Sequence, residues 1–410
     1  MMLMDVFSKD VIVVGIVSFI ASLCDMLFSL VLGRSLNEVL FGKINFIFSL
    51  ISLGVLTLTF SQQTVLIRIL SDPDGNESNW RKFMWKIISL SAIAGVLYIL
   101  CINLFYGLWR EGIYIYIAMM LLILIEYLSS FLRAHHRFLR SILILKIPSV
   151  FCLCLAFSYF AVYHLVSMDH FLSFYSLCLL IPVFIGLRVL KGYPNGRREI
   201  SASLKSGGML FFLIGLMFIL MIYVDRFLIV KILGYGPLGG YSAIWVIIKI
   251  YDFITSVFYF TLVPIYSRGK RLDSLKIDSV LFFILAALVS MTIFFMGPQL
   301  IHFMFHGRYD HVINLLKFFI ITGSLKIMFI VPSGLICGYL PNHRLRQFFK
   351  FLVVGLIGYC LASYILIVRI GLIGASVGGI IIWAYLVVVG YWISFAQIEE
   401  ERNVKFGGGH

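Results

Sequence analysis

The sequence predicts an all-α membrane protein, with about twelve transmembrane helices in two pseudo-symmetric six-helix lobes around a central cavity. Three observations predict this class. The composition is 61% hydrophobic and only 13% charged, with a mean hydropathy of +1.03. Apolar runs of about 20 residues recur along the chain, each long enough to cross a hydrocarbon core about 30 Å thick as a helix. These runs do not alternate in polarity, which excludes a transmembrane barrel.

The breaks between the apolar runs define the spans in order along the chain. Their predicted centres are Ile20, Leu53, Ala94, Leu122, Leu153, Ser176, Ile219, Phe253, Ile284, Thr322, Gly358 and Ala384. The connections are short, the longest being the polar stretches around SDPDGNESNWRK, KGYPNGRREISASLK and SRGKRLDSLK. We therefore expect no soluble domain.

A faint internal repeat predicts the two lobes. The segments DMLFSLVLGRSLNEVLFGKINF and DRFLIVKILGYGPLGGYSAI share a carboxylate (Asp25, Asp225), a Leu-Gly at the helix exit and a later glycine (Gly42, Gly240). Such an echo indicates a duplicated membrane protein with an ionisable group at matching depth in both halves.

Six spans precede the KGYPNGRREISASLK loop and six follow it. This division predicts an N-terminal six-helix lobe at residues 1–195 and a C-terminal six-helix lobe at residues 196–410. Because each lobe has an even number of spans, the repeat is parallel, an arrangement in which the substrate site lies between the halves.

The basic residues predict orientation rather than a nucleic-acid partner. The net charge is +14, yet the Lys and Arg residues gather on every second connection, including RAHHRFLR and NHRLRQFFK. By the positive-inside rule, this asymmetry places both termini in the cytoplasm of a multi-pass protein of the cell inner membrane. A nucleic-acid surface would not be distributed in this way, whereas attraction to anionic membrane lipids would follow from it.

Charged side chains inside the spans are the candidate functional groups. Each costs roughly 2.5–3.5 kcal/mol at a helix centre, so these groups must pair with one another or face water. The substrate-binding candidates are Arg226, Lys249, Lys326 and Arg34, and the candidates for ion or proton coupling are Asp25, Asp225, Asp252 and Glu126.

Several of these charges have two interpretations. Lys249 and Asp252 are three residues apart and can meet on one helix face, either as a neutralising pair or as cavity lining. The guanidinium of Arg226 suits a diphosphate, which it can bind in bidentate fashion, but it can also be locked to Asp25 or Asp225. Glu126 is a proton site or a helix–helix hydrogen-bonding group.

The sequence predicts neither a metal site nor a cofactor. All seven cysteines fall inside apolar runs, where they behave as small hydrophobic residues. Cys152 and Cys154 are two apart on a helix and point in different directions, so they cannot jointly hold a metal.

Three stretches resemble a known family. VLGRSLNEVLFGKINFIFSLISL, followed by FSQQTVLIRILS, is similar to the first two helices of the oligosaccharide flippases of the polysaccharide biosynthesis (O-antigen) family. DRFLIVKILGYGPLGGYSAIWVIIKIYDF with LVPIYSR resembles their seventh and eighth helices, and GLIGASVGGI resembles their last. The family belongs to the multidrug, oligosaccharidyl-lipid and polysaccharide exporter superfamily, whose members move undecaprenyl-diphosphate-linked sugar units from the inner to the outer leaflet.

The resemblance implies alternating access between two six-helix lobes around a cationic cavity. It also implies a lipid-linked oligosaccharide as the cargo and other polysaccharide assembly proteins as partners. By position, Asp25, Asp225, Arg226 and Lys249 fall on helices that line the cavity in such proteins. This chain departs from the pattern in having few mid-span cations in its first half.

Competing functions are weighed by what the sequence lacks. An ATP-driven exporter would carry a GxxxxGK[ST] loop, which does not occur here. A membrane glycosyltransferase or polymerase would be expected to carry its catalytic residues on a sizeable external loop, so we expect no enzyme. The segment HGRYDH, which contains His306, Arg308, Asp310 and His311, is the best candidate for catalytic residues of that class. An ion-coupled multidrug or small-solute antiporter on the same scaffold is the stronger alternative.

Overall fold

The computed structural model describes residues 9–59, 66, 79–135, 137–162, 168–193, 207–267 and 275–407. Within these ranges the chain is almost entirely helical and contains no strand. Twelve helical segments of this described part are long and apolar enough to cross a membrane. The predicted all-α class with about twelve transmembrane helices is therefore confirmed, and the chain is a multi-pass membrane protein.

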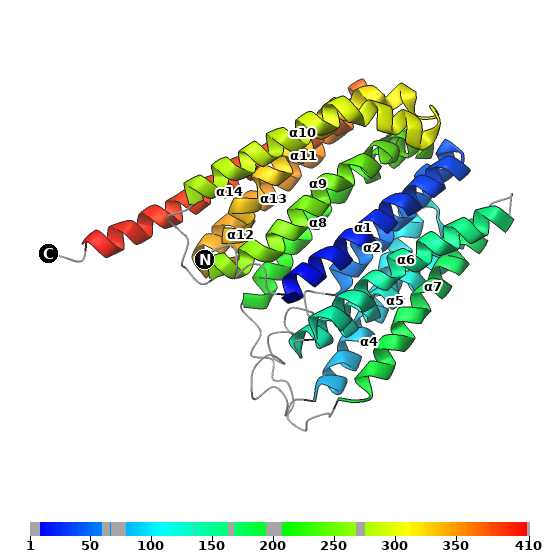
Figure 1. Cartoon of the computed structure of the whole chain (residues 1–410), viewed down its shortest axis with the longest axis horizontal. Helices are drawn as coiled ribbons and strands as arrows, with labels where there is room; N and C mark the ends of the chain where they lie inside the picture. Colours follow the sequence, from blue (N-terminus) through cyan, green and yellow to red (C-terminus); the bar gives the residue numbers. More distant parts are fainter. Residues whose placement is uncertain are drawn as a thin grey trace. The chain divides into compact units, whose positions relative to one another are not determined.

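The described part of the first half of the chain contains six long helices (Figure 1). They are α1 (Lys9–Ser35), α2 (Glu38–Leu58), α4 (Trp80–Tyr106), α5 (Trp109–Ala134), α6 (Phe138–Val162) and α7 (Met168–Leu190). Helix α1 packs mainly on α6, and α5 packs on α7, α6 and α4. Helix α4 begins where the Asn79 side chain accepts a hydrogen bond of 3.1 Å from the backbone N–H of Lys82, and it ends at Gly107, whose φ is 66°.

The second half contains six spans built from seven α-helices and one 3-10 helix. They are α8 (Gly207–Ile232), α9 (Tyr235–Ser267), α10 (Leu275–Phe305), η3 (Asp310–Leu315), α11 (Leu316–Met328), α12 (Ile330–Gly338), α13 (Asn342–Ile370) and α14 (Leu372–Gly407). Helix α11 packs against α9, α10 and α14, while α13 packs mainly on α14. Helices α9, α11 and α10 run side by side in this order (Figure 1).

The chain divides into two compact units. The first comprises residues 1–37 and 44–219, and the second comprises residues 38–43 and 220–410. The first residues of α2 thus belong to the second unit. The predicted lobe boundary between residues 195 and 196 lies outside the described residues.

The helices of the second unit differ in how much surface they bury. Only 22% of the Leu275–Phe305 span is buried, whereas 72% of the Asp310–Gly338 span is buried. The exposed side chains of α10 include Leu281, Phe283 and Leu288, which are suited to contact lipid. Polar groups on α11 therefore lie in the interior of this unit, where they require partners.

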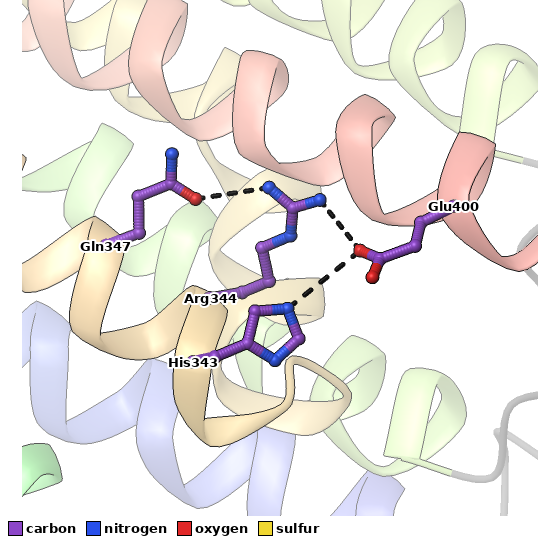
Figure 2. Close-up of polar contacts among 4 residues, drawn as sticks. All are labelled: His343, Arg344, Gln347 and Glu400. Carbon is purple, nitrogen blue, oxygen red and sulfur yellow. Dashed lines mark hydrogen bonds and ion pairs between the residues drawn. The ribbon is translucent and has the colours of Figure 1, made fainter.

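A polar cluster joins the start of α13 to the C-terminal part of α14 (Figure 2). The guanidinium of Arg344 donates to Glu400 at 2.7 Å through Nη2 and to Gln347 at 3.1 Å through Nη1. His343 Nε2 lies 3.9 Å from the same carboxylate. Because Pro341 precedes α13, this end of the helix forms next to a bend in the chain, and the cluster links it to α14.

Candidate functional site

A cavity in the second unit is lined by side chains from five helices, α8, α9, α11, α13 and α14. It is narrow, with a volume of about 20 Å³ that holds about one water molecule, and it is partly open to its surroundings. The walls are mostly apolar and aromatic, with Trp245, Phe319 and Trp383 among them. Two charged residues, Asp225 and Lys326, also face it. This combination of aromatic walls with a few convergent polar groups is typical of small-molecule sites.

Asp225 is held in place by hydrogen bonds at the edge of this cavity. Its side chain is only 4% exposed, and it lies on α8. The Tyr241 hydroxyl from α9 donates a short hydrogen bond to Oδ2, and the backbone N–H of Arg226 donates to Oδ1 at 2.7 Å. A carboxylate held this firmly in a low-dielectric environment is a candidate for binding a proton or a cation.

Aromatic rings surround the two basic residues near the cavity. The guanidinium of Arg226 lies 5.3 Å from the ring centroid of Tyr223 and 5.4 Å from that of Trp245. The ammonium of Lys326 lies 4.3 Å from the Trp245 centroid and 5.4 Å from the Trp383 centroid. Such cation–π contacts stabilise positive charge where water is scarce.

Lys326 forms an ion pair with Asp252, in which Nζ lies 2.6 Å from Oδ1. The sequence indicated that Lys326 needs an aqueous or anionic partner, and Asp252 supplies the latter. Among the described residues, Asp252 forms its ion pair with a buried lysine on a different helix rather than with Lys249. Lys249 is half-buried on α9 and is not among the residues that line the cavity.

A second polar chain crosses the same unit. The Tyr251 hydroxyl lies 2.8 Å from the Ser290 hydroxyl, which lies 2.5 Å from the Ser324 hydroxyl. These groups connect α9, α10 and α11. The ring of Tyr251 packs so close to Gly323 that a side chain at that glycine would overlap it. These hydroxyl contacts and the close packing of Tyr251 on Gly323 therefore hold α11 in position next to α9 and α10, close to Lys326 in the sequence of α11.

The remaining sequence candidates lie in the first unit. Asp25 is half-buried on α1 and interacts electrostatically with Cys152 on α6 and Tyr175 on α7. Glu126 on α5 interacts with Arg133 and Lys146. Arg34 is half-buried in the last turn of α1. Asp25, Arg34 and Glu126 are thus placed in one unit, and Asp225, Arg226, Lys249, Asp252 and Lys326 in the other.

Sequence reasoning missed the aromatic half of the site. Tyr241, Trp245 and Trp383 come from α9 and α14, and no local pattern separates them from the other aromatic residues, which form 16% of the chain. The one available signal is the position of Tyr241 relative to the turn between α8 and α9. Asp225 precedes this turn and Tyr241 follows it at a similar spacing, so both residues lie at about the same height along the two helices. The tyrosine is the residue that this turn brings back to the carboxylate.

The arrangement has two chemical capacities. A buried carboxylate with a tyrosine donor can exchange a proton or an inorganic cation, and a buried ammonium between indole rings can hold an anion. Both lie on one cavity, so the occupancy of one group alters the electrostatic potential at the other.

Comparisons with known proteins identify the fold. No family model matches the chain, and no curated protein matches it. A solved structure described as the outward-facing conformation of a multidrug resistance MATE family transporter of the MOP superfamily matches with a TM-score of 0.59 at 15% identity, covering 96% of both chains. A MATE structure in complex with MaD3S matches with a TM-score of 0.62 at 16% identity, covering 96% of this chain and 97% of that one.

A third similar structure concerns a MOP superfamily transporter from Pyrococcus furiosus, described under the words "reverse polarity of binding pocket suggests different function". It has a TM-score of 0.59 and 14% identity, covering 95% of this chain and 96% of that chain. The chain therefore has the fold of the MATE transporters of the MOP superfamily over nearly its whole length.

Proposed function

We propose that this protein is an ion-coupled antiporter that moves a small organic solute across the membrane by alternating access. The observation that carries the proposal is the buried Asp225 carboxylate on an aromatic cavity inside a membrane-spanning unit. A carboxylate in such a place is expensive to maintain and marks an ion or proton pathway. The fold shared with MATE transporters supports transport as the activity.

Roles are assigned from position and charge. Asp225 is the principal coupling residue, with Asp25, Asp252 and Glu126 as further candidates. Lys326 and Arg226 contact the solute, because they bring positive charge to the aromatic walls. Lys249 and Arg34 are the remaining substrate-binding candidates. Binding of a proton at Asp225 removes a negative charge from the cavity edge, which changes the affinity of the cavity for a charged solute.

The first prediction tests coupling in proteoliposomes that contain the full-length protein. The probes are three naphthalene compounds of fixed charge: a sulfonate, a trimethylammonium and a neutral sulfonamide. Vesicles with an acidic lumen should accumulate at least one charged probe, and vesicles at equal pH with an imposed sodium gradient identify the ion. Asp225→Asn should lower gradient-driven accumulation more than about tenfold, since neutralising the carboxylate removes the ion site.

The matched control is Asp169→Asn, which changes the same residue type in the first turn of α7. This variant should retain gradient-driven accumulation. If no probe accumulates under either gradient, or if Asp225→Asn accumulates the probe as well as the unmodified protein, the antiporter proposal is wrong.

A second candidate function is a lipid-linked oligosaccharide flippase, which the sequence motifs favour. The position of Arg226 next to the cavity suits a diphosphate group. We rank this function second because two of the solved structures that share the fold are described as MATE transporters, one of them as a multidrug resistance transporter. Deleting the gene distinguishes the two: a flippase deletion accumulates lipid-linked sugar in the inner leaflet and depletes surface polysaccharide, whereas an antiporter deletion does neither.

A further inference from the structure

The ion pair between Lys326 and Asp252 is asymmetric. The Lys326 side chain is 7% exposed, whereas the Asp252 side chain is 45% exposed. The lysine is enclosed by the helices of the unit, and the aspartate reaches it from an accessible position. If the pair separates, the ammonium remains enclosed and requires another anion.

Lys326 also faces the cavity, and Asp252 is not among the residues that line it. The ammonium has three N–H donors, and Asp252 is its one hydrogen-bond acceptor in the described part of the chain. The indole faces of Trp245 and Trp383 lie at 4.3 and 5.4 Å. An anionic group that reaches the cavity can therefore bind the ammonium through its remaining N–H donors.

The other charges near the cavity disfavour a cation at this position. Asp225 already accepts hydrogen bonds from Tyr241 and from the Arg226 backbone, and the Arg226 guanidinium lies 5.4 Å from the ring centroid of Trp245. The ammonium of Lys326 itself occupies the place that a cationic ligand would take between the two indoles. Exchanging one anion for another keeps the lysine paired, whereas a cation would have to displace it.

We propose that the transported solute is an organic anion whose carboxylate, sulfonate or phosphate replaces the Asp252 carboxylate on Lys326. The inference rests on the proposed transport function, since it names the solute of the same cavity. Asp252 then acts as a resident counter-ion, which neutralises the lysine when the cavity is empty and competes with the solute for it.

The test measures binding rather than transport, with the purified full-length protein and the same three naphthalene compounds. The unmodified protein should bind the sulfonate and not the trimethylammonium or the sulfonamide. Lys326→Met should weaken sulfonate binding about tenfold or more, because the shape of the side chain is kept and its charge is lost. Asp252→Asn should strengthen it several-fold, because the competing carboxylate is gone.

Lys317→Met is the matched control, because Lys317 is an exposed lysine on the same helix, α11. It should leave sulfonate binding unchanged. Lys326→Arg keeps a cation and should keep at least partial binding, and size-exclusion profiles confirm that each variant is folded. Lys326→Met and Asp252→Asn are expected to change sulfonate affinity in opposite directions. If only one of the two variants folds, that variant alone still tests the inference.

The outcomes separate this inference from the proposed function. Sulfonate binding that survives Lys326→Met, or that weakens in Asp252→Asn, overturns the exchange of anions. Gradient-driven transport of the trimethylammonium without sulfonate binding leaves the antiporter in place and overturns the inference. Lys326-dependent sulfonate binding without transport of any probe supports the inference and overturns the antiporter.

Discussion

At the scale of single residues, two charged side chains of the second unit, Asp225 and Lys326, have polar partners that offset the cost of burying them in a membrane-spanning unit. The Tyr241 hydroxyl donates a hydrogen bond to Asp225. Lys326 forms an ion pair with Asp252 and cation–π contacts with two indole rings. The tyrosine and the tryptophans are as important as the charges, since they allow the charges to remain buried next to a cavity.

The second prediction concerns the hydrogen bond from Tyr241 to Asp225. Tyr241→Phe should lower the free energy of unfolding in mixed micelles by about 1.5–3 kcal/mol, the range for a hydrogen bond to a charged group. Tyr364→Phe removes a hydroxyl at a side chain that is 53% exposed and should have almost no effect. Equal stability of the two variants would show that the carboxylate does not depend on this donor.

At the scale of elements, the starts of α2 and α9 make a close contact, in which Gly42 is one of the glycines of the internal repeat. A methyl group on Gly42 of α2 would overlap the carbonyl oxygen of Tyr235, and one on Gly239 of α9 would overlap the carbonyl oxygen of Glu38. The two helix starts approach backbone to backbone. Just before α9, Gly234 has a φ of 93°, which allows the tight turn out of α8.

The third prediction follows from that contact. Gly42→Ala should destabilise the protein by about 1–3 kcal/mol, the usual effect of adding a group to a closely packed position. Gly358→Ala is the control, because its new methyl group meets open space inside α13. That variant should gain up to about 1 kcal/mol from its higher helix propensity. Thermal unfolding of both variants checks the opposite signs, and a stable Gly42→Ala protein would contradict the close approach.

At the scale of the whole molecule, the helix order and the positions of basic residues predict the topology. With the N-terminus in the cytoplasm, the connections at Gly107 and Gly371 face outward, and those at Lys191 and Leu340 face inward. The basic cluster of His343, Arg344 and Arg346 then lies at the cytoplasmic end of α13, next to the anionic headgroups that attract it.

The fourth prediction tests this orientation with alkaline phosphatase fusions in the cell inner membrane. Fusions after Gly107 and after Gly371 should be active, because the enzyme is active only outside the cytoplasm. Fusions after Lys191 and after Leu340 should be inactive. An active fusion at either inward position would contradict the topology and the placement of both termini.

The sequence by itself determined the fold class, the number of spans and which charged residues are functional candidates. The physical reason is that the thickness of the bilayer sets the length of each apolar span, and that a charge inside such a span is costly and therefore rare. Both features can be identified from the amino-acid sequence alone. Of the repeated Leu-Gly exits, Leu233-Gly234 directly follows the end of α8 at Ile232, whereas Leu32-Gly33 lies within the last turn of α1, which ends at Ser35.

Only the tertiary structure decided which charges meet. Helix periodicity placed Lys249 and Asp252 on one face, yet Asp252 pairs with Lys326 from α11 because helix packing brings those side chains within 2.6 Å. The aromatic walls depend on the same packing, since Trp245 and Trp383 come from helices far apart in the chain. The spacing along one helix fixes which residues share a face, while partners across helices are fixed by how the helices pack.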